Sequence, residues 1–321
     1  MELYQREGEE ATVIDLHNDL LSYLALSPSH MPDEASCCSA RQLREGGIRC
    51  QVLPAFFQTI AGSEKTLERQ LACFRRLFEE YPDDFSTSLQ PGTIHIRWAI
   101  ENVSTFLGEE EPLENGINRL QAACQEFGPP VYVSLTWNGE NRCGGGVGAD
   151  KGLTEDGRAI LEALDRRVAL DLSHASDRLA YDMAEHSSRL LIASHSNFRS
   201  VMNASHNLPD DLAQEIVKRD GVIGLNVIKP FIGNSKDSFF DHIDYALSHG
   251  WEGALSFGAD FYSMESVPED LKEELVGHFF TEWKDPSSAR HIAAEVVSRF
   301  GTDIARKLFW SNAWEKLLKR S

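Results

Sequence analysis

The stretch that decides the fold is VIDLHNDLL, residues 13–21, close to the start of the chain. Its apolar residues have the character of a buried strand, and they lead directly into His17, Asn18 and Asp19. Alternate residues of a strand face the same side, so the pattern predicts that His17 and Asp19 point together. A nitrogen beside a carboxylate can bind one divalent metal ion. An isolated pair of this kind is short and common, so the rest of the sequence must decide between a metal site and a solvated strand end.

Further apolar segments alternate with segments of helical periodicity along the chain. The other predicted strands are 47–57, 93–101, 131–137, 168–174, 190–195, 221–228 and 253–260. The predicted helices, in which apolar residues recur three and four apart, include 64–81, 157–167, 176–188, 210–221 and 241–250. Repeated strand–helix units with nearly continuous apolar strands predict an α/β fold, a closed TIM-like (β/α)8 barrel.

The alternative to a barrel is an open, doubly wound sheet. No GxGxxG motif follows the first strand, which argues against the dinucleotide-binding form of that fold. We find no linker or repeat, so we expect a single domain over residues 1–321. The connection 263–288 is long and predicts either a lid or a dimer contact. The glycine-rich stretch 143–152 lacks the GK[ST] ending of a phosphate loop and is interpreted as a flap beside the fourth strand.

Composition and charge exclude several classes of function. Apolar residues make up 42% of the chain and charged residues 25%, which is typical of a soluble globular protein. The net charge of −19 disfavours nucleic acids and anionic membrane surfaces as partners. The sequence shows no signal-peptide pattern and no apolar run near the ~20 residues that span a bilayer. Six cysteines without CxxC spacing indicate free thiols, and together these features predict a cytoplasmic protein.

Side chains that can bind metals end several of the predicted strands. In a TIM-like barrel the carboxyl ends of the strands form the active site, so we expect these side chains to meet at one rim. Each of them alone has a structural explanation as a helix cap or an ion-pair partner, but their equivalent positions favour a shared site. The residues are His17, Asp19, Glu101, His174, His195 and Asp260.

This set of side chains suits two metal ions bridged by Glu101, with Asp260 left free for proton transfer. Mixed nitrogen and oxygen ligands favour two Zn²⁺ per chain, although manganese, iron and cobalt are alternatives. Two adjacent ions can polarise a carbonyl and generate a hydroxide near neutral pH. The residues therefore predict a metal-dependent hydrolase.

The sequence resembles the membrane (renal-type) dipeptidases, a binuclear zinc branch of the amidohydrolase superfamily. The resemblance covers nearly the whole chain and rests on DLHNDLL, Ile100-Glu101, GLTEDGRAILEAL, LDLSHAS, LIASHSNFRS, NLPDDL, FGADF and FWSNAWEKLLKR. It implies hydrolysis of dipeptides, including those with a D-residue at the carboxyl side, by a hydroxide that bridges the two ions. It also implies a homodimer.

By this resemblance, His17 and Asp19 hold one zinc ion, His174 and His195 hold the other, Glu101 joins them and Asp260 is the acid/base residue.

Three substrate-contact positions differ from the family pattern, and we interpret the residues there as substrate-binding: Trp137, His206 and Tyr262. His206 stands where members have an arginine that binds the substrate carboxylate, and a histidine cannot hold a carboxylate bidentately. Dipeptide specificity is therefore less well supported than hydrolysis. The alternative is a hydrolase of another small amide, a lactone or an N-acyl amino acid. A third hypothesis, a binding protein with a vestigial metal site, does not explain why Asp260 is present.

Overall fold

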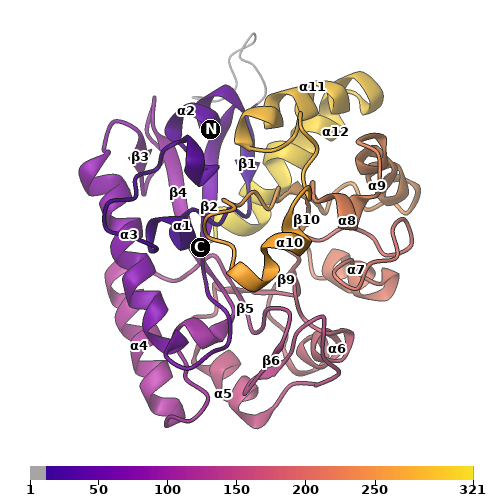
Figure 1. Cartoon of the computed structure of the whole chain (residues 1–321). Coiled ribbons are helices and arrows are strands. Elements are labelled where there is room, and N and C mark those ends of the chain that lie inside the picture. Colours follow the sequence, from indigo (N-terminus) through magenta and orange to yellow (C-terminus); the bar gives the residue numbers. More distant parts are fainter. Residues whose placement is uncertain (1–11, 321) are drawn as a thin grey trace.

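Eight parallel strands form the centre of the computed structural model, which describes residues 12–320 (Figure 1). Six of them form one sheet in the order β1-β2-β4-β5-β8-β9, and β10 pairs with β11. Bridges from Ala193 to Ile223 and from Asn18 to Phe261 join the two groups and close the ring, which confirms the predicted barrel. The strands are β1 (Val13–Asp15), β2 (Ile48–Phe56), β4 (Ile94–Glu101), β5 (Tyr132–Ser134), β8 (Ala169–Asp171), β9 (Leu191–Ile192), β10 (Ile223–Leu225) and β11 (Leu255–Phe257).

Helices surround these strands on the outside of the barrel (Figure 1). A short strand, β3 (Phe85–Ser86), pairs with the first residues of β4. The helices are α1 (Leu20–Leu24), α2 (Ala40–Glu45), α3 (Thr66–Glu80), α4 (Leu113–Phe127), α5 (Glu155–Ala163), α6 (Asp177–His186), α7 (Asp210–Lys218), α8 (Lys229–Ile232), α9 (Asp237–Ser248), α10 (Lys272–Leu275), α11 (Ala289–Phe300) and α12 (Thr302–Arg306). Residues Lys307–Ser311 and Trp314–Leu318 continue as π-helical turns.

The alternation of side chains along the strands divides the core into two layers. Ile14 and Ile192 belong to a cluster inside the barrel, whereas their neighbours Val13 and Leu191 belong to the larger cluster that includes residues of the helices. Leu317 of the C-terminal turns joins the inner cluster and closes one end of the barrel. The opposite end, where the strands finish, is left for polar side chains.

The strands are shorter than predicted, and most of the candidate metal ligands lie just beyond them. β1 ends at Asp15, so His17 and Asp19 are not on a strand and the expected two-residue alternation does not apply to them. His174 and Asp260 also follow their strands, and both have positive φ angles of 65° and 64°. Backbone in this region cannot continue a β ladder, so neither strand could extend through these residues. Glu101 alone among the predicted ligands is the last residue of a strand.

The two loops that the sequence singled out are also defined. Residues 143–152 contribute to a small antiparallel hairpin of β6 (Glu140–Asn141) and β7 (Gly144–Gly145) beside β5. Residues 263–288 contain α10, which crosses in front of the strands in Figure 1.

All six cysteines are free, as predicted. The longest helices, α3 and α4, have 15 residues each, and none of the helices within residues 12–320 has the length and apolar character to cross a membrane.

Gly258 provides a test of how tightly the barrel is packed near the site. A Cβ on Gly258 would clash with the carbonyl oxygen of Ser194, the residue before His195, whereas a Cβ on Gly253 has only the Lys316 side chain within 4 Å. We expect Gly258→Ala to lower the free energy of unfolding by about 2 kcal/mol or more, because backbone cannot yield as a side chain can. The matched change Gly253→Ala should alter it by less than ~0.5 kcal/mol. Equal denaturation midpoints for the two variants would contradict this packing.

Candidate metal centre

The structure brings all six side chains predicted to form the site together at the carboxyl ends of the strands. His17 Nε2 lies 3.6 Å from Asp19 Oδ1, 3.3 Å from Glu101 Oε2 and 3.8 Å from Asp260 Oδ1. His174 Nε2 lies 2.9 Å and His195 Nε2 3.9 Å from Glu101 Oε1. These spacings allow the side chains to share metal ions.

Glu101 divides the cluster into two halves. Its Oε2 faces His17, and its Oε1 faces His174 and His195. Its side chain is almost completely buried. A carboxylate whose two oxygens face different histidines is arranged to bridge two cations rather than to hold one.

A hydrogen bond on the far side of its ring fixes the tautomer of His17. The Tyr132 hydroxyl donates its only hydrogen to the Leu16 carbonyl at 3.0 Å, so its oxygen accepts from Nδ1–H of His17 at 2.9 Å. Nε2 of His17 then presents a lone pair to the cluster, and it has no hydrogen-bond partner among the described residues. This is how metal-binding histidines are usually oriented.

His174 and His195 are oriented in the same way. The amide oxygen of Asn138 accepts from Nδ1–H of His174 at 2.9 Å. The Ser194 hydroxyl donates to Asp171 Oδ2 at 2.5 Å, so its oxygen accepts from Nδ1–H of His195 at 2.7 Å. Both rings therefore direct an Nε2 lone pair toward Glu101. A lone pair and a carboxylate oxygen repel each other unless a proton or a metal ion lies between them, and nitrogen and carboxylate ligands directed at one point fit a metal ion.

Sequence reasoning missed the buried acids that support these histidines. Asp171 is fully buried and accepts hydrogen bonds from the backbone of Ser173 and Ser194 and from the Ser134 hydroxyl. Asp15 is also fully buried and accepts from the backbone of His17 and Ala259. A signal was available, because each acid stands inside an apolar strand shortly before a metal-capable histidine, in DLH and in DLSH.

Burial and neighbouring charges shift the pKa values of this cluster, in several cases in opposite directions. Burial would raise the pKa of Glu101, but His17 and His174 outweigh it and hold the pKa below its usual value. Burial would lower the pKa of His17, but Tyr132 and Glu101 raise it well above normal, so unless a metal ion takes its place a proton on Nε2 faces Glu101. Burial raises the pKa of Asp260 and lowers that of His195, and in His195 neighbouring imidazoles add to the shift.

The backbone around the site is held in an uncommon conformation. Of the five non-glycine residues with positive φ among the described residues, Asn102, His174 and Asp260 lie at or next to the cluster. Such residues cost of order 1–3 kcal/mol each and concentrate at functional sites. Their presence here is independent of the side-chain chemistry and points to the same place.

A pocket opens directly onto one side of the cluster. Asp19, Glu101, His174 and Asp260 line its floor. No arginine or lysine is among the described residues that line it. Its apolar wall consists of Phe56, Trp137, Ile228, Phe231, Tyr262, Val267, Pro268, Leu271 and Leu275.

Two of the three residues interpreted as substrate-binding line this pocket. Trp137 packs against Phe56, with 5.1 Å between ring centroids, and Tyr262 packs against Phe279 at 5.0 Å. The third, His206, is buried and is not among the described lining residues. Its Nε2 lies instead 3.3 Å from His174 Nε2.

A closed parallel barrel with histidines and carboxylates gathered at the carboxyl ends of its strands is the arrangement of a metal-dependent hydrolase. The sequence agrees, because the model of the membrane dipeptidase family (peptidase family M19) matches residues 4–317. The chain belongs to this family, which confirms the resemblance seen in the sequence. Its class is therefore that of the metal-dependent dipeptidases, which are metallopeptidases.

Individual relatives are distant in sequence but similar in structure. An uncharacterized dipeptidase of Schizosaccharomyces pombe is 24% identical over 298 residues, which are 81% of this chain and 72% of that protein. A metallo peptidase from Rhodobacter sphaeroides, solved with a phosphinate mimic of L-Ala-D-Ala, has a TM-score of 0.78 at 19% identity over 97% and 99% of the two chains. The dipeptidase AC has a TM-score of 0.77 at 20% identity over 98% and 99%.

Tyr132→Phe tests the orientation of His17. Loss of the hydroxyl removes the acceptor of Nδ1–H, so we expect zinc affinity to fall ~10–100-fold, the usual effect of losing an outer-shell partner. The control is Tyr245→Phe, whose hydroxyl donates to Asp210 instead and whose loss should leave zinc affinity unchanged. Competition with a chelator measures both affinities, and equal values for the two variants would contradict the role of Tyr132.

Proposed function

We propose that the protein hydrolyses the amide bond of dipeptides with two zinc ions. His17 and Asp19 would hold one ion, His174 and His195 the other, and Glu101 would join them. The observation that carries the proposal is that one oxygen of Glu101 faces His17 and the other faces His174 and His195. The similar Rhodobacter sphaeroides peptidase holds a dipeptide mimic with a D-residue, which supports a dipeptide of that kind as substrate.

When bound, the ions would polarise the scissile carbonyl and lower the pKa of the attacking water, so that it becomes a strong nucleophile near neutral pH. Asp260 supplies the proton transfer, because its carboxyl lines the pocket beside the other polar side chains of the cluster. As a carboxylate it would accept the proton that the attacking water releases, and as a carboxylic acid it would deliver that proton to the leaving amine nitrogen as the amide bond breaks. Glu101, whose pKa is lowered, stays ionised between the two groups of histidines.

The pocket walls determine which substrates fit. Trp137 and Tyr262 offer aromatic surfaces on which a substrate side chain can pack. We propose that residues 263–288 act as a lid, because Val267, Leu271 and Leu275 of this segment line the same pocket as Asp19. Closure of such a lid would exclude water from the reacting bond.

We also propose that the protein works in the cytoplasm. Its six free cysteines fit the reducing environment of that compartment. A homodimer stays a prediction from the family resemblance.

The pocket also supports a second candidate, the hydrolysis of another small amide, a lactone or an N-acyl amino acid. No arginine or lysine is among the described lining residues to pair with the terminal carboxylate of a dipeptide. Assays of the zinc-loaded enzyme on L,L-dipeptides, L,D-dipeptides, N-acyl amino acids and lactones separate the two candidates. If no dipeptide is turned over while one of the other classes is, the second candidate replaces the first.

The pocket lining also predicts how the enzyme acts on a dipeptide whose carboxyl end is amidated, because no arginine or lysine is among the described lining residues. Since a charge-assisted pair is worth roughly 1.5–3 kcal/mol, a cationic clamp would make a free carboxylate about 10–100-fold better than a carboxamide. Without such a clamp, we expect a dipeptide and its C-terminal amide to differ in kcat/KM by less than ~10-fold. A 100-fold loss on amidation would show that a cationic group reaches the substrate after all.

Asp260→Asn tests the proton transfer. We expect kcat to fall by at least ~100-fold, because the amide cannot exchange a proton with the leaving group. Zinc content should be measured in parallel, since the experiment requires that the variant keep both ions. The control is Asp241→Asn, which makes the same change at an exposed aspartate of α9 outside the pocket lining and should leave kcat unchanged. Full activity of the zinc-loaded Asp260→Asn variant would remove Asp260 from the mechanism.

A further inference from the structure

His206 is presented to the metal centre by a well-anchored loop between β9 and α7. The guanidinium of Arg199 donates to the carbonyls of Ser205 and Asn207, on either side of His206, at 2.9 Å each. Arg199 is itself held by two hydrogen bonds to the Asp177 carboxylate, of 2.6 and 2.8 Å. The backbone that carries His206 is therefore fixed by interactions outside the site.

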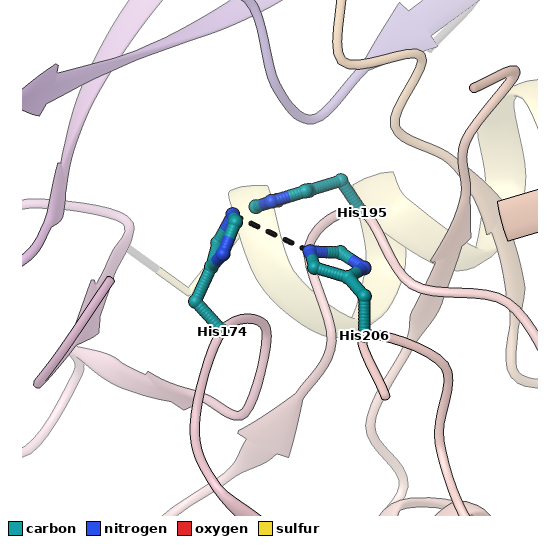
Figure 2. Close-up of side chains that lie close together, drawn as sticks. All are labelled: His174, His195 and His206. Atoms are coloured by element: carbon teal, nitrogen blue, oxygen red, sulfur yellow. Dashed lines mark hydrogen bonds between the residues drawn. The ribbon is translucent and has the colours of Figure 1, made fainter. Parts of the chain in front are cut away.

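Its ring is fixed as well. The imidazole of His206 stacks on Phe231, with ring centroids 4.3 Å apart and planes inclined by 8°. The residue is only 5% exposed. Figure 2 shows that the rings of His174, His195 and His206 point toward one another, and their ligand atoms all lie within 4.8 Å of each other.

The distance between two of these rings matches the geometry of a shared zinc ion. Zinc–nitrogen bonds of about 2.0–2.1 Å in a tetrahedral site place two ligand nitrogens roughly 3.3–3.4 Å apart. Nε2 of His206 lies 3.3 Å from Nε2 of His174. A hydrogen bond between the two rings would give a similar distance, but the lone pair of His174 also faces Glu101 Oε1 at 2.9 Å. A cation between the rings and Glu101 satisfies all three groups at once.

We propose that His206 is a third histidine ligand of the ion held by His174 and His195, and not a substrate contact. The inference rests on the metal centre of the proposed function and adds a residue to it. With Glu101, this ion gains four protein ligands, the number typical of closed zinc sites. The ion held by His17, Asp19 and Glu101 keeps three, the number that leaves a position open for water or substrate.

The pocket reaches both halves of the cluster. Asp19, Asp260 and His174 line it, whereas His17, His195 and His206 are not among its described lining residues. The asymmetry between the two ions therefore rests on the number of their protein ligands. We expect one tightly held zinc ion and one that exchanges more readily.

The test uses His206→Phe, which keeps an aromatic ring against Phe231 but cannot bind a metal. Its control is His278→Phe, because His278 lines the pocket but lies outside the three-histidine group. Chelator competition on the full-length protein should show the tighter zinc ion weakened by ~100-fold or more in His206→Phe, beyond the 10–100-fold that an outer-shell residue costs. The control should keep the wild-type affinity.

A second measurement needs no variant and guards against misfolding of His206→Phe. X-ray absorption of wild-type protein loaded with one equivalent of zinc should count three imidazole ligands. A count of two, or unchanged zinc affinity in a folded His206→Phe variant, overturns the inference while leaving the binuclear centre in place. A different result would contradict the proposed function. In that case wild-type protein would bind two zinc ions but hydrolyse none of the amides tested. If wild-type protein binds no zinc, both proposals fall.

Discussion

The site depends on one buried carboxylate, that of Glu101, which faces the lone pairs of histidines on both sides. Burial in a protein interior makes such an arrangement unfavourable unless positive charge lies between the groups. Tyr132, Asn138 and Ser194 accept the Nδ1 hydrogens of the facing rings, so further protons would have to bind at the Nε2 atoms. Burial and the neighbouring imidazoles lower the pKa of His195 and oppose a proton there. Divalent cations are the charges that fit the remaining nitrogen and carboxylate ligands.

The barrel is what places these groups together. Candidate ligands far apart in the sequence converge because the carboxyl ends of parallel strands meet at one rim. The alternation of side chains separates an inner apolar layer from an outer one, and the C-terminal turns around Leu317 close the end away from the site. Asp15 and Asp171, both inside strands, connect this core to the histidines through backbone and hydroxyl groups. The same buried acids therefore contact both the strands and the residues around the candidate metal ligands.

Much of the fold and the candidate site could be predicted from the sequence, because the relevant patterns are local. Apolar runs and helical periodicity predicted the eight barrel strands, and polar side chains at their ends predicted the cluster. The prediction that His17 and Asp19 alternate on a strand was wrong, since β1 ends before them. The role of Tyr132 depends on what lies across the barrel, which no local pattern shows. The position of His206 beside His174 likewise depends on a loop that Arg199 fixes from outside.

The central claim is that Glu101 stands between two cations, and anomalous X-ray diffraction tests it most directly. Crystals of the protein grown with zinc should be measured on both sides of the zinc absorption edge. The account predicts two anomalous peaks, one beside Oε2 of Glu101 near His17 and Asp19, the other beside Oε1 near His174, His195 and His206. No peak at this rim in zinc-saturated crystals, or a single peak that leaves one group of histidines without an ion, would contradict it.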